Sequence, residues 1–249
     1  MARIVLVHGA WGQAAGWSDV VEALRRLGHL VEAVDLPGHG SDPAPLGRVT
    51  LDDCGRAVAA VLAEGEPAVL VGHSMGGMVI SAAAERAPEA IRQLVYLAAF
   101  LPRDGDSLTA LKRREPETIG PAIRRGPESG TTVLDPDVAA EILFQDANPA
   151  QRERGLALLG AESNAVQTDP VSLTARRFGS VPRSYVVCTE DRTVTSWLQW
   201  RMASESPCRA LRELDCGHFP QLTRAEELAG ILSELAEDQP YLEKGAAIY

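Results

Sequence analysis

Short apolar runs alternate with amphipathic segments along the first part of the chain. Runs such as RIVLVHG and PAVLVGHS have the length and flanking glycines of strands, whereas residues 14–27 and 50–62 repeat apolar positions at helical spacing. A third helix is expected from about Ser74 to the residue before Pro88, which cannot continue it, and a fourth strand over 91–97. Strands that alternate with helices predict an α/β fold with a parallel sheet and crossover helices.

This alternation stops over residues 103–179, which are charged, interrupted by prolines and carry short helical patterns such as DPDVAAEILFQDA. The alternation then resumes. We expect two further strands over residues 184–188 and 209–214, and two helices over residues 194–204 and 224–237. We therefore predict a core made of residues 1–102 and 180–249, with a helical cap inserted after the fourth strand. The tail, residues 238–249, has no periodicity and is expected to be a frayed end.

Charge and composition narrow the possible functions. The formal net charge of -10 and the pI near 5.0 argue against a nucleic-acid partner, which requires clustered Lys and Arg. The apolar run near the amino terminus is too short for a signal peptide, and no apolar stretch is long enough to span a membrane. We expect a cytoplasmic protein without a membrane partner. The spacing of the Cys and His residues predicts free thiols and no metal site.

The segment VLVGHSMGG contains the candidate nucleophile. Ser74 lies in Gly72-His73-Ser74-Met75-Gly76, which fits the G-x-S-x-G pattern, with a predicted strand before it and a predicted helix after it. The pattern alone is weak, but this context is the one that the motif requires. A sharp turn between the glycines would present the serine hydroxyl at the carboxyl edge of the sheet.

A serine hydroxyl needs a base to take its proton and an acid to orient that base. His218 follows a predicted strand and is the only histidine after His73, so it is the candidate base. Asp191 follows the preceding predicted strand and has the chain order Ser, Asp, His that this motif implies. Glu190 and Asp215 remain alternatives for the acid.

The loop HGAW, which follows the first strand, predicts part of an oxyanion hole. The backbone N–H groups of Ala10 and Met75 are the candidate donors, and Gly9 allows the loop to approach the serine. An apolar substrate pocket is expected from Gly9, Trp11, Phe100, Phe144 and Phe219. For Phe144 and for Trp197, packing inside the core or cap is an equally good interpretation.

The motifs LVHGAW, DLPGHG and GHSMGG, with the late Asp and GH, resemble those of the α/β-hydrolase superfamily. The resemblance is closer to the small cap-bearing esterases that include plant methylesterases, hydroxynitrile lyases and their bacterial relatives. It implies a mostly parallel six-stranded sheet, no cofactor and a cap over the serine. It also implies a triad and two oxyanion donors at Ser74, Asp191, His218, Ala10 and Met75.

Two positions distinguish the branches of this group. The cyanohydrin-cleaving branch has a threonine at the position of Gly9 and a lysine at the position of Phe219, so lyase activity is not expected here. The chain also departs from the plant members at Gly12 and Ala15, where histidine and tryptophan are common, so the shape of their pocket cannot be transferred.

The sequence thus favours hydrolysis of a small to medium, largely apolar carboxylic ester through an acyl-enzyme. A dedicated biosynthetic enzyme on the same scaffold, which opens a lactone, cleaves a C–C bond or cyclises an intermediate, is an alternative. A non-catalytic protein that binds a small molecule in the cap cavity is another. In the first two cases the partner is a small-molecule ester or lactone, and monomer and homodimer both remain open.

Overall fold

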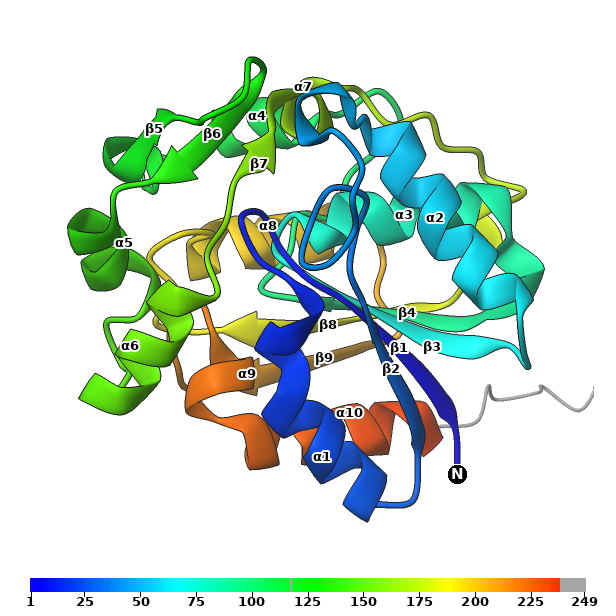
Figure 1. Cartoon of the computed structure of the whole chain (residues 1–249). Helices are drawn as coiled ribbons and strands as arrows, with labels where there is room; N and C mark the ends of the chain where they lie inside the picture. Colours follow the sequence, from blue (N-terminus) through cyan, green and yellow to red (C-terminus); the bar gives the residue numbers. More distant parts are fainter. Residues whose placement is uncertain (117, 238–249) are drawn as a thin grey trace, which may run out of the picture.

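The computed structural model describes residues 1–116 and 118–237, and the predicted frayed tail lies outside these residues. Its centre is a six-stranded parallel sheet with strand order β2-β1-β3-β4-β8-β9, which confirms the predicted fold class (Figure 1). The strands are β1 (Arg3–Val7), β2 (Leu30–Val34), β3 (Ala68–His73), β4 (Ile91–Leu97), β8 (Arg183–Cys188) and β9 (Ala210–Leu214).

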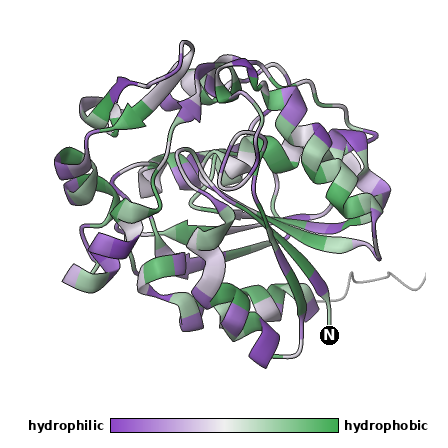
Figure 2. Cartoon of the chain, viewed as in Figure 1, coloured by the Kyte–Doolittle hydropathy of each residue, from purple (hydrophilic) through white to green (hydrophobic). Residues whose placement is uncertain are grey.

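Helices cover both faces of this sheet, as a parallel sheet requires. One face packs against α1 (Ser18–Arg26) and α10 (Ala225–Glu237), and the other against α2 (Leu51–Ala63), α3 (Gly76–Arg86) and α8 (Ser196–Glu205). Because β3 and β8 lie inside these two apolar layers, every residue of both strands is buried. Figure 2 shows hydrophobic residues concentrated along the strands, with hydrophilic residues on the outer sides of the helices.

Local sequence explains where α2 and α1 begin. Thr50 caps α2 by accepting a hydrogen bond from the Asp53 N–H, and the Asp53 side chain in turn accepts one from the Thr50 N–H. The helix predicted over 14–27 is instead a short 3-10 turn, η1 (Ala14–Trp17), followed by α1. Gly16, a poor helix former, lies in the part that is not α-helical.

The segment between β4 and β8 contains the predicted helices and also three short strands, which the sequence analysis did not predict. A small antiparallel sheet has the order β5-β6-β7. Its hairpin turns at Gly130, whose φ of +81° is in the region that favours glycine. The elements are α4 (Leu108–Lys112), β5 (Ile123–Arg125), β6 (Thr131–Leu134), α5 (Pro136–Leu143), α6 (Pro149–Ala157), β7 (Glu162–Ser163) and α7 (Asn164–Thr168).

The remaining elements are short. The four-residue helix α9 follows β9, and four further 3-10 turns connect the longer elements: α9 (Pro220–Thr223), η2 (Leu46–Arg48), η3 (Pro88–Ala90), η4 (Gly120–Ala122) and η5 (Phe178–Ser180). No helix of the described chain is sufficiently long and apolar to cross a bilayer.

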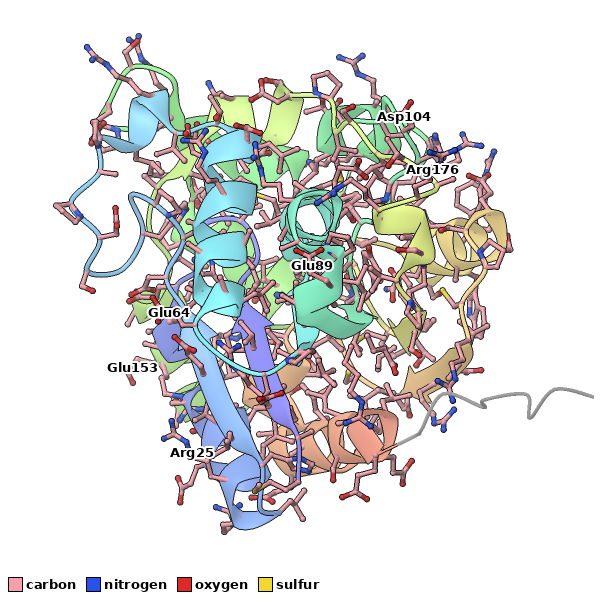
Figure 3. The ribbon with its side chains drawn as sticks, turned by 90° about the vertical axis from the view of Figure 1, so that its right-hand side faces the viewer. Arg25, Glu64, Glu89, Asp104, Glu153 and Arg176 are labelled. Carbon is pink, nitrogen blue, oxygen red and sulfur yellow. The ribbon has the colours of Figure 1, made fainter. Side chains whose placement is uncertain are left out.

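Charged residues of the core and of the inserted segment lie on the outer surface. Figure 3 shows six of them on the side of the molecule that it presents, and all six are exposed: Arg25, Glu64, Glu89, Asp104, Glu153 and Arg176. The acidic balance of the chain is therefore carried at least in part by solvated side chains, as expected for a surface that confers solubility.

Candidate active site

Ser74 occupies a strained turn between β3 and α3. Its φ is +53°, which is uncommon for a residue other than glycine. A Cβ added at Gly72 would lie 2.6 Å from the Gly76 carbonyl oxygen, and one added at Gly76 would lie 2.8 Å from the His8 carbonyl oxygen. The two glycines of the motif are therefore required by close backbone packing, and this packing holds Ser74 above the end of β3.

Ser74, His218 and Asp191 form a continuous chain of hydrogen bonds. The Ser74 Oγ lies 3.0 Å from the His218 Nε2, and the His218 Nδ1 lies 2.7 Å from the Asp191 Oδ2. The three residues follow the carboxyl ends of β3, β9 and β8, which meet at one edge of the parallel sheet. A carboxylate can only accept, so Nδ1 carries the proton and Nε2 is free to accept the serine proton.

The structure distinguishes among the three candidate acids. Besides His218, Asp191 accepts the backbone N–H groups of Thr193 at 2.7 Å and Val194 at 3.0 Å. By contrast, the hydrogen bond recorded for the Asp215 carboxylate comes from the Thr189 hydroxyl, at 3.0 Å. Neither Asp215 nor Glu190 is hydrogen-bonded to His218 among the described residues.

Gln199 supports the acid and was missed by the sequence analysis. Its side chain is fully buried, and its Nε2 donates to the Asp191 Oδ2 at 3.2 Å and to the Val194 carbonyl at 2.7 Å. Its Oε1 accepts the backbone N–H of Cys188 at 3.0 Å. The sequence offered one signal for this role, a glutamine between apolar residues on the helix predicted over 194–204. A glutamine that is buried with its apolar neighbours needs hydrogen-bond partners for its amide.

His73 and His8 are buried and contact backbone groups. The His73 Nε2 lies 2.7 Å from the His218 carbonyl oxygen, and its Nδ1 lies 3.3 Å from the Gln221 Nε2. Burial, followed by the nearby His218, holds the pKa of His73 well below its ordinary value. Burial, followed by the nearby His39, lowers the pKa of His8 to about 4. Both rings are therefore neutral at pH 7.

A cavity lies directly over Ser74. The residues proposed as oxyanion donors, Ala10 and Met75, line it together with Trp11 and Phe100. The loop after β1 approaches the serine so closely that a Cβ at position 9 would lie 2.8 Å from the Ser74 Cβ. The sequence analysis missed the remaining wall, which comes from the cap and from the loop after β8: Leu108, Lys112, Ile119, Gln167 and Thr193.

Three of the expected pocket residues do not line this cavity. Phe144 is fully buried, and its ring centroid lies 4.9 Å from that of Phe219 inside an apolar cluster of the cap. Phe219 and Gly9 line a separate cavity beside His73. Phe144 was expected equally to pack inside the cap, and its burial in this cluster agrees with that reading.

Gly12, which replaces a histidine common in the plant members, also lines the cavity beside His73. Trp197 is 54% exposed, and the Arg201 guanidinium lies 5.3 Å from its ring centroid. Trp197 therefore belongs to the surface and not to a substrate pocket or the core.

Comparison with known proteins identifies the family. A model of the alpha/beta hydrolase family matches residues 4–231. The chain belongs to the alpha/beta hydrolase family. Esterase PIR7B of Oryza sativa subsp. japonica is 33% identical, with 94% of this chain and 95% of the relative covered. Methylesterase 7 of Arabidopsis thaliana is 28% identical, with 94% and 96% covered.

A solved structure agrees with these relatives. A pyrethroid hydrolase from Sphingobium faniae JZ-2 has 26% sequence identity and a TM-score of 0.84, with 95% of this chain and 98% of that chain covered. The resemblance seen in the motifs is thus confirmed, and the chain is an α/β hydrolase similar to esterases and methylesterases.

A buried acid of the cap, Glu162, holds the loop after β1 in this α/β hydrolase. Glu162 is fully buried, and its Oε2 accepts the backbone N–H of Trp11 at 3.2 Å. The same oxygen lies 3.2 Å from the His39 Nε2, and Oε1 accepts the Ser163 N–H at 2.7 Å. Burial lowers the pKa of His39, but the hydrogen bond and the negative charge of Glu162 outweigh burial and leave this pKa raised.

Two further cap groups hold Trp11. The Trp11 carbonyl accepts the Gly160 N–H at 2.7 Å, and the indole N–H donates to the Thr132 Oγ1 at 3.2 Å. Trp11 also has a φ of +59°, which is uncommon for a large side chain and requires support from its surroundings. In this hydrolase the cap therefore holds the residue next to Ala10 through its N–H, its carbonyl and its side chain.

Proposed function

We propose that the chain is a serine hydrolase that cleaves carboxylic esters through an acyl-enzyme intermediate. The observation that carries this proposal is the unbroken hydrogen-bond chain from the Ser74 hydroxyl through His218 to Asp191. The strained backbone of Ser74 and the adjacent cavity add to it. Each residue then has the role that acyl transfer by a serine nucleophile requires.

The reaction follows from the position of the protons. The Ser74 Oγ attacks the ester carbonyl while the His218 Nε2 accepts its proton, and Asp191 stabilises the resulting imidazolium. The imidazolium then protonates the leaving alcohol, which departs and leaves the acyl group on Ser74. Water enters, gives a proton to His218 and attacks the acyl carbon. The bond between that carbon and the Ser74 Oγ then breaks, the imidazolium returns the proton to Oγ, and the carboxylic acid is released.

Negative charge develops on the carbonyl oxygen during both attacks. The backbone N–H groups of Ala10 and Met75, on two loops beside Ser74, are the proposed donors to this oxygen. Donors fixed by backbone need no rearrangement when the charge appears. In a serine protease, removal of one side-chain donor to the same kind of oxygen costs about 10²- to 10³-fold in kcat.

The proposed substrate is a small to medium ester with a largely apolar part. Trp11, Phe100 and Leu108 supply apolar lining beside the serine. Relatives named as methylesterase and pyrethroid hydrolase support an ester as the substrate. Lyase activity is not proposed, because Gly9 and Phe219 supply neither the hydroxyl nor the ammonium expected of the cyanohydrin-cleaving branch.

The test combines active-site labelling with turnover. Intact-mass labelling with a fluorophosphonate is measured for the wild type, for Ser74→Ala and for the exposed-serine control Ser204→Ala, alongside hydrolysis of p-nitrophenyl and methyl esters. We expect one adduct in the wild type and in Ser204→Ala, none in Ser74→Ala, and a loss of turnover on the order of 10⁴-fold or more in Ser74→Ala. Full activity in Ser74→Ala would refute the mechanism.

Other outcomes favour the alternative functions. One adduct without ester turnover would favour a dedicated enzyme for a lactone or another restricted substrate. Saturable binding of a small molecule with no adduct at all would favour the binding-protein alternative.

A further inference from the structure

One wall of the cavity over Ser74 carries polar side chains that the proposed reaction does not use. Thr193 follows the proposed triad acid by two residues, Gln167 lies on the cap helix α7, and Lys112 is the last residue of α4. All three line the cavity, whereas its other lining residues apart from Ser74 are apolar. Three segments thus place polar groups where the substrate must bind.

The Thr193 hydroxyl is buried without a partner. Thr193 is only 6% exposed, and its Oγ1 has no hydrogen bond to any described residue. Its backbone is fixed on both sides, since its N–H donates to the Asp191 Oδ1 at 2.7 Å and its carbonyl accepts the Thr118 hydroxyl at 2.8 Å. An unpaired buried hydroxyl is unfavourable, so its retention at a rigid position of the catalytic cavity needs an explanation.

Gln167, on the cap helix α7, also lines this cavity. It is 9% exposed, and its side-chain amide makes no hydrogen bond to any residue that the structure describes. Apart from the Thr193 hydroxyl, the fully buried polar side-chain atoms that lack a partner among the described residues belong to residues that do not line this cavity: Trp17, Glu115, Gln145, Asp146 and Gln221. The catalytic cavity therefore contains two neutral hydrogen-bonding groups that are available to a ligand.

We propose that Thr193 and Gln167 bind a hydrogen-bond-accepting oxygen of the substrate, so that the natural substrate carries a keto, hydroxyl or carboxylate oxygen besides its ester group. This inference rests on the proposed ester hydrolysis. The hydroxyl and the amide each donate to such an oxygen, and the positive charge of Lys112 on the same wall disfavours a cationic substrate. Trp11 and Phe100 contact the apolar remainder.

Matched pairs of substrates test this proposal. Turnover of p-nitrophenyl pentanoate is compared with that of the 4-oxopentanoate, and the hexanoate with the 5-oxohexanoate, while the p-nitrophenyl monoester of glutaric acid tests an anionic oxygen. We expect the wild type to prefer at least one oxygen-bearing ester about tenfold in kcat/KM. Thr193→Val should lower kcat/KM for that ester relative to the plain ester about 3- to 10-fold, the size of one hydrogen bond. Gln167→Met should act in the same direction.

The matched control is Ile119→Val, which changes the same cavity without a polar group and should affect both esters of a pair equally. Thermal unfolding gives a second readout, because Thr193→Val removes an unpaired buried hydroxyl and should keep or raise the Tm. A clear fall in Tm would show that the hydroxyl has a structural partner and would overturn the proposal.

The two proposals fail in different ways. Equal turnover of plain and oxygen-bearing esters, or an equal loss on both in Thr193→Val, would overturn the substrate class and leave ester hydrolysis standing. Absence of any turnover that depends on Ser74 would overturn both.

Discussion

Replacing Asp191 by asparagine tests whether this carboxylate sets the tautomer of His218. The Asp191 Oδ1 accepts two backbone N–H groups, from Thr193 and Val194, whereas Oδ2 accepts the His218 Nδ1 and the Gln199 amide. In Asp191→Asn the amide oxygen must occupy the position of Oδ1, because an NH₂ group there would face the two N–H donors of Thr193 and Val194. The NH₂ group then points at His218 and at Gln199.

This arrangement places a donor against the His218 Nδ1–H. The ring relieves the conflict by carrying its proton on Nε2 instead, and a protonated Nε2 cannot accept the proton of Ser74. The same substitution of a triad aspartate in a serine protease lowers kcat about 10⁴-fold. We expect a loss of this size, which corresponds to about 5.4 kcal/mol of transition-state stabilisation at about 1.36 kcal/mol per tenfold change.

The assay is kcat/KM for a p-nitrophenyl ester between pH 5 and 9, with thermal unfolding as a check on folding. Glu190→Gln and Asp215→Asn are the matched controls, because each removes one neighbouring carboxylate that is not hydrogen-bonded to His218. Both should retain activity within about threefold, an effect of well under 1 kcal/mol. A folded Asp191→Asn variant with activity within tenfold of the wild type would refute the tautomer argument, as would an equal loss in Glu190→Gln.

Three further predictions concern the turn at Ser74 and the cap. Gly76→Ala should prevent correct folding or lower the free energy of unfolding by about 3 kcal/mol or more, because its Cβ would lie 2.8 Å from a backbone oxygen, and urea denaturation measures this. Glu162→Gln should lower the free energy of unfolding by about 3 to 5 kcal/mol, because it breaks a buried pair. It should also reduce kcat more than it raises KM, because the loop of the proposed oxyanion donor Ala10 loses its support, and unchanged kinetics in a folded variant would contradict this. The raised pKa of His39 makes the pair fully stabilising below the ordinary value of 6.5, and this stabilisation is lost as pH rises through the raised value. The pKa values of His8 and His73 are lowered, so these two residues affect stability only at lower pH. Denaturation between pH 6.5 and 9 should therefore show that the free energy of unfolding of the wild type falls as pH rises, and that it depends less on pH in Glu162→Gln.

Sequence patterns predicted the core of this hydrolase well because its signals are local. The strand predicted over 91–97 coincides with β4, and the turn at Ser74 is dictated by glycines within two residues of it. The sequence favoured Asp191 but left Glu190 open as an alternative. Both acids follow the same strand, and only the backbone path after β8 determines which carboxylate reaches His218.

The cap was predicted less well for a physical reason. The strands β5 and β7 contain three and two residues, too few to show an alternating pattern. Residues of β5 are also largely exposed, so burial leaves little trace in their composition. Contacts between distant segments, such as Glu162 with Trp11, depend on the assembled fold and have no local signature.

These contacts determine how the cap can change during evolution or engineering. The core supplies Ser74, Asp191 and His218 from strand ends that are buried and rigid, so substitutions in the cavity wall formed by the cap should alter substrate choice without moving the proposed catalytic groups. Glu162 is different, because the cap strand that carries it also holds the loop of the proposed oxyanion donor Ala10. A graft that replaces the cap without this carboxylate would keep the hydrogen-bonded triad and still lose transition-state stabilisation. Substrate choice should therefore be changed at the cavity-lining positions of α4 and α7, and β7 must be retained.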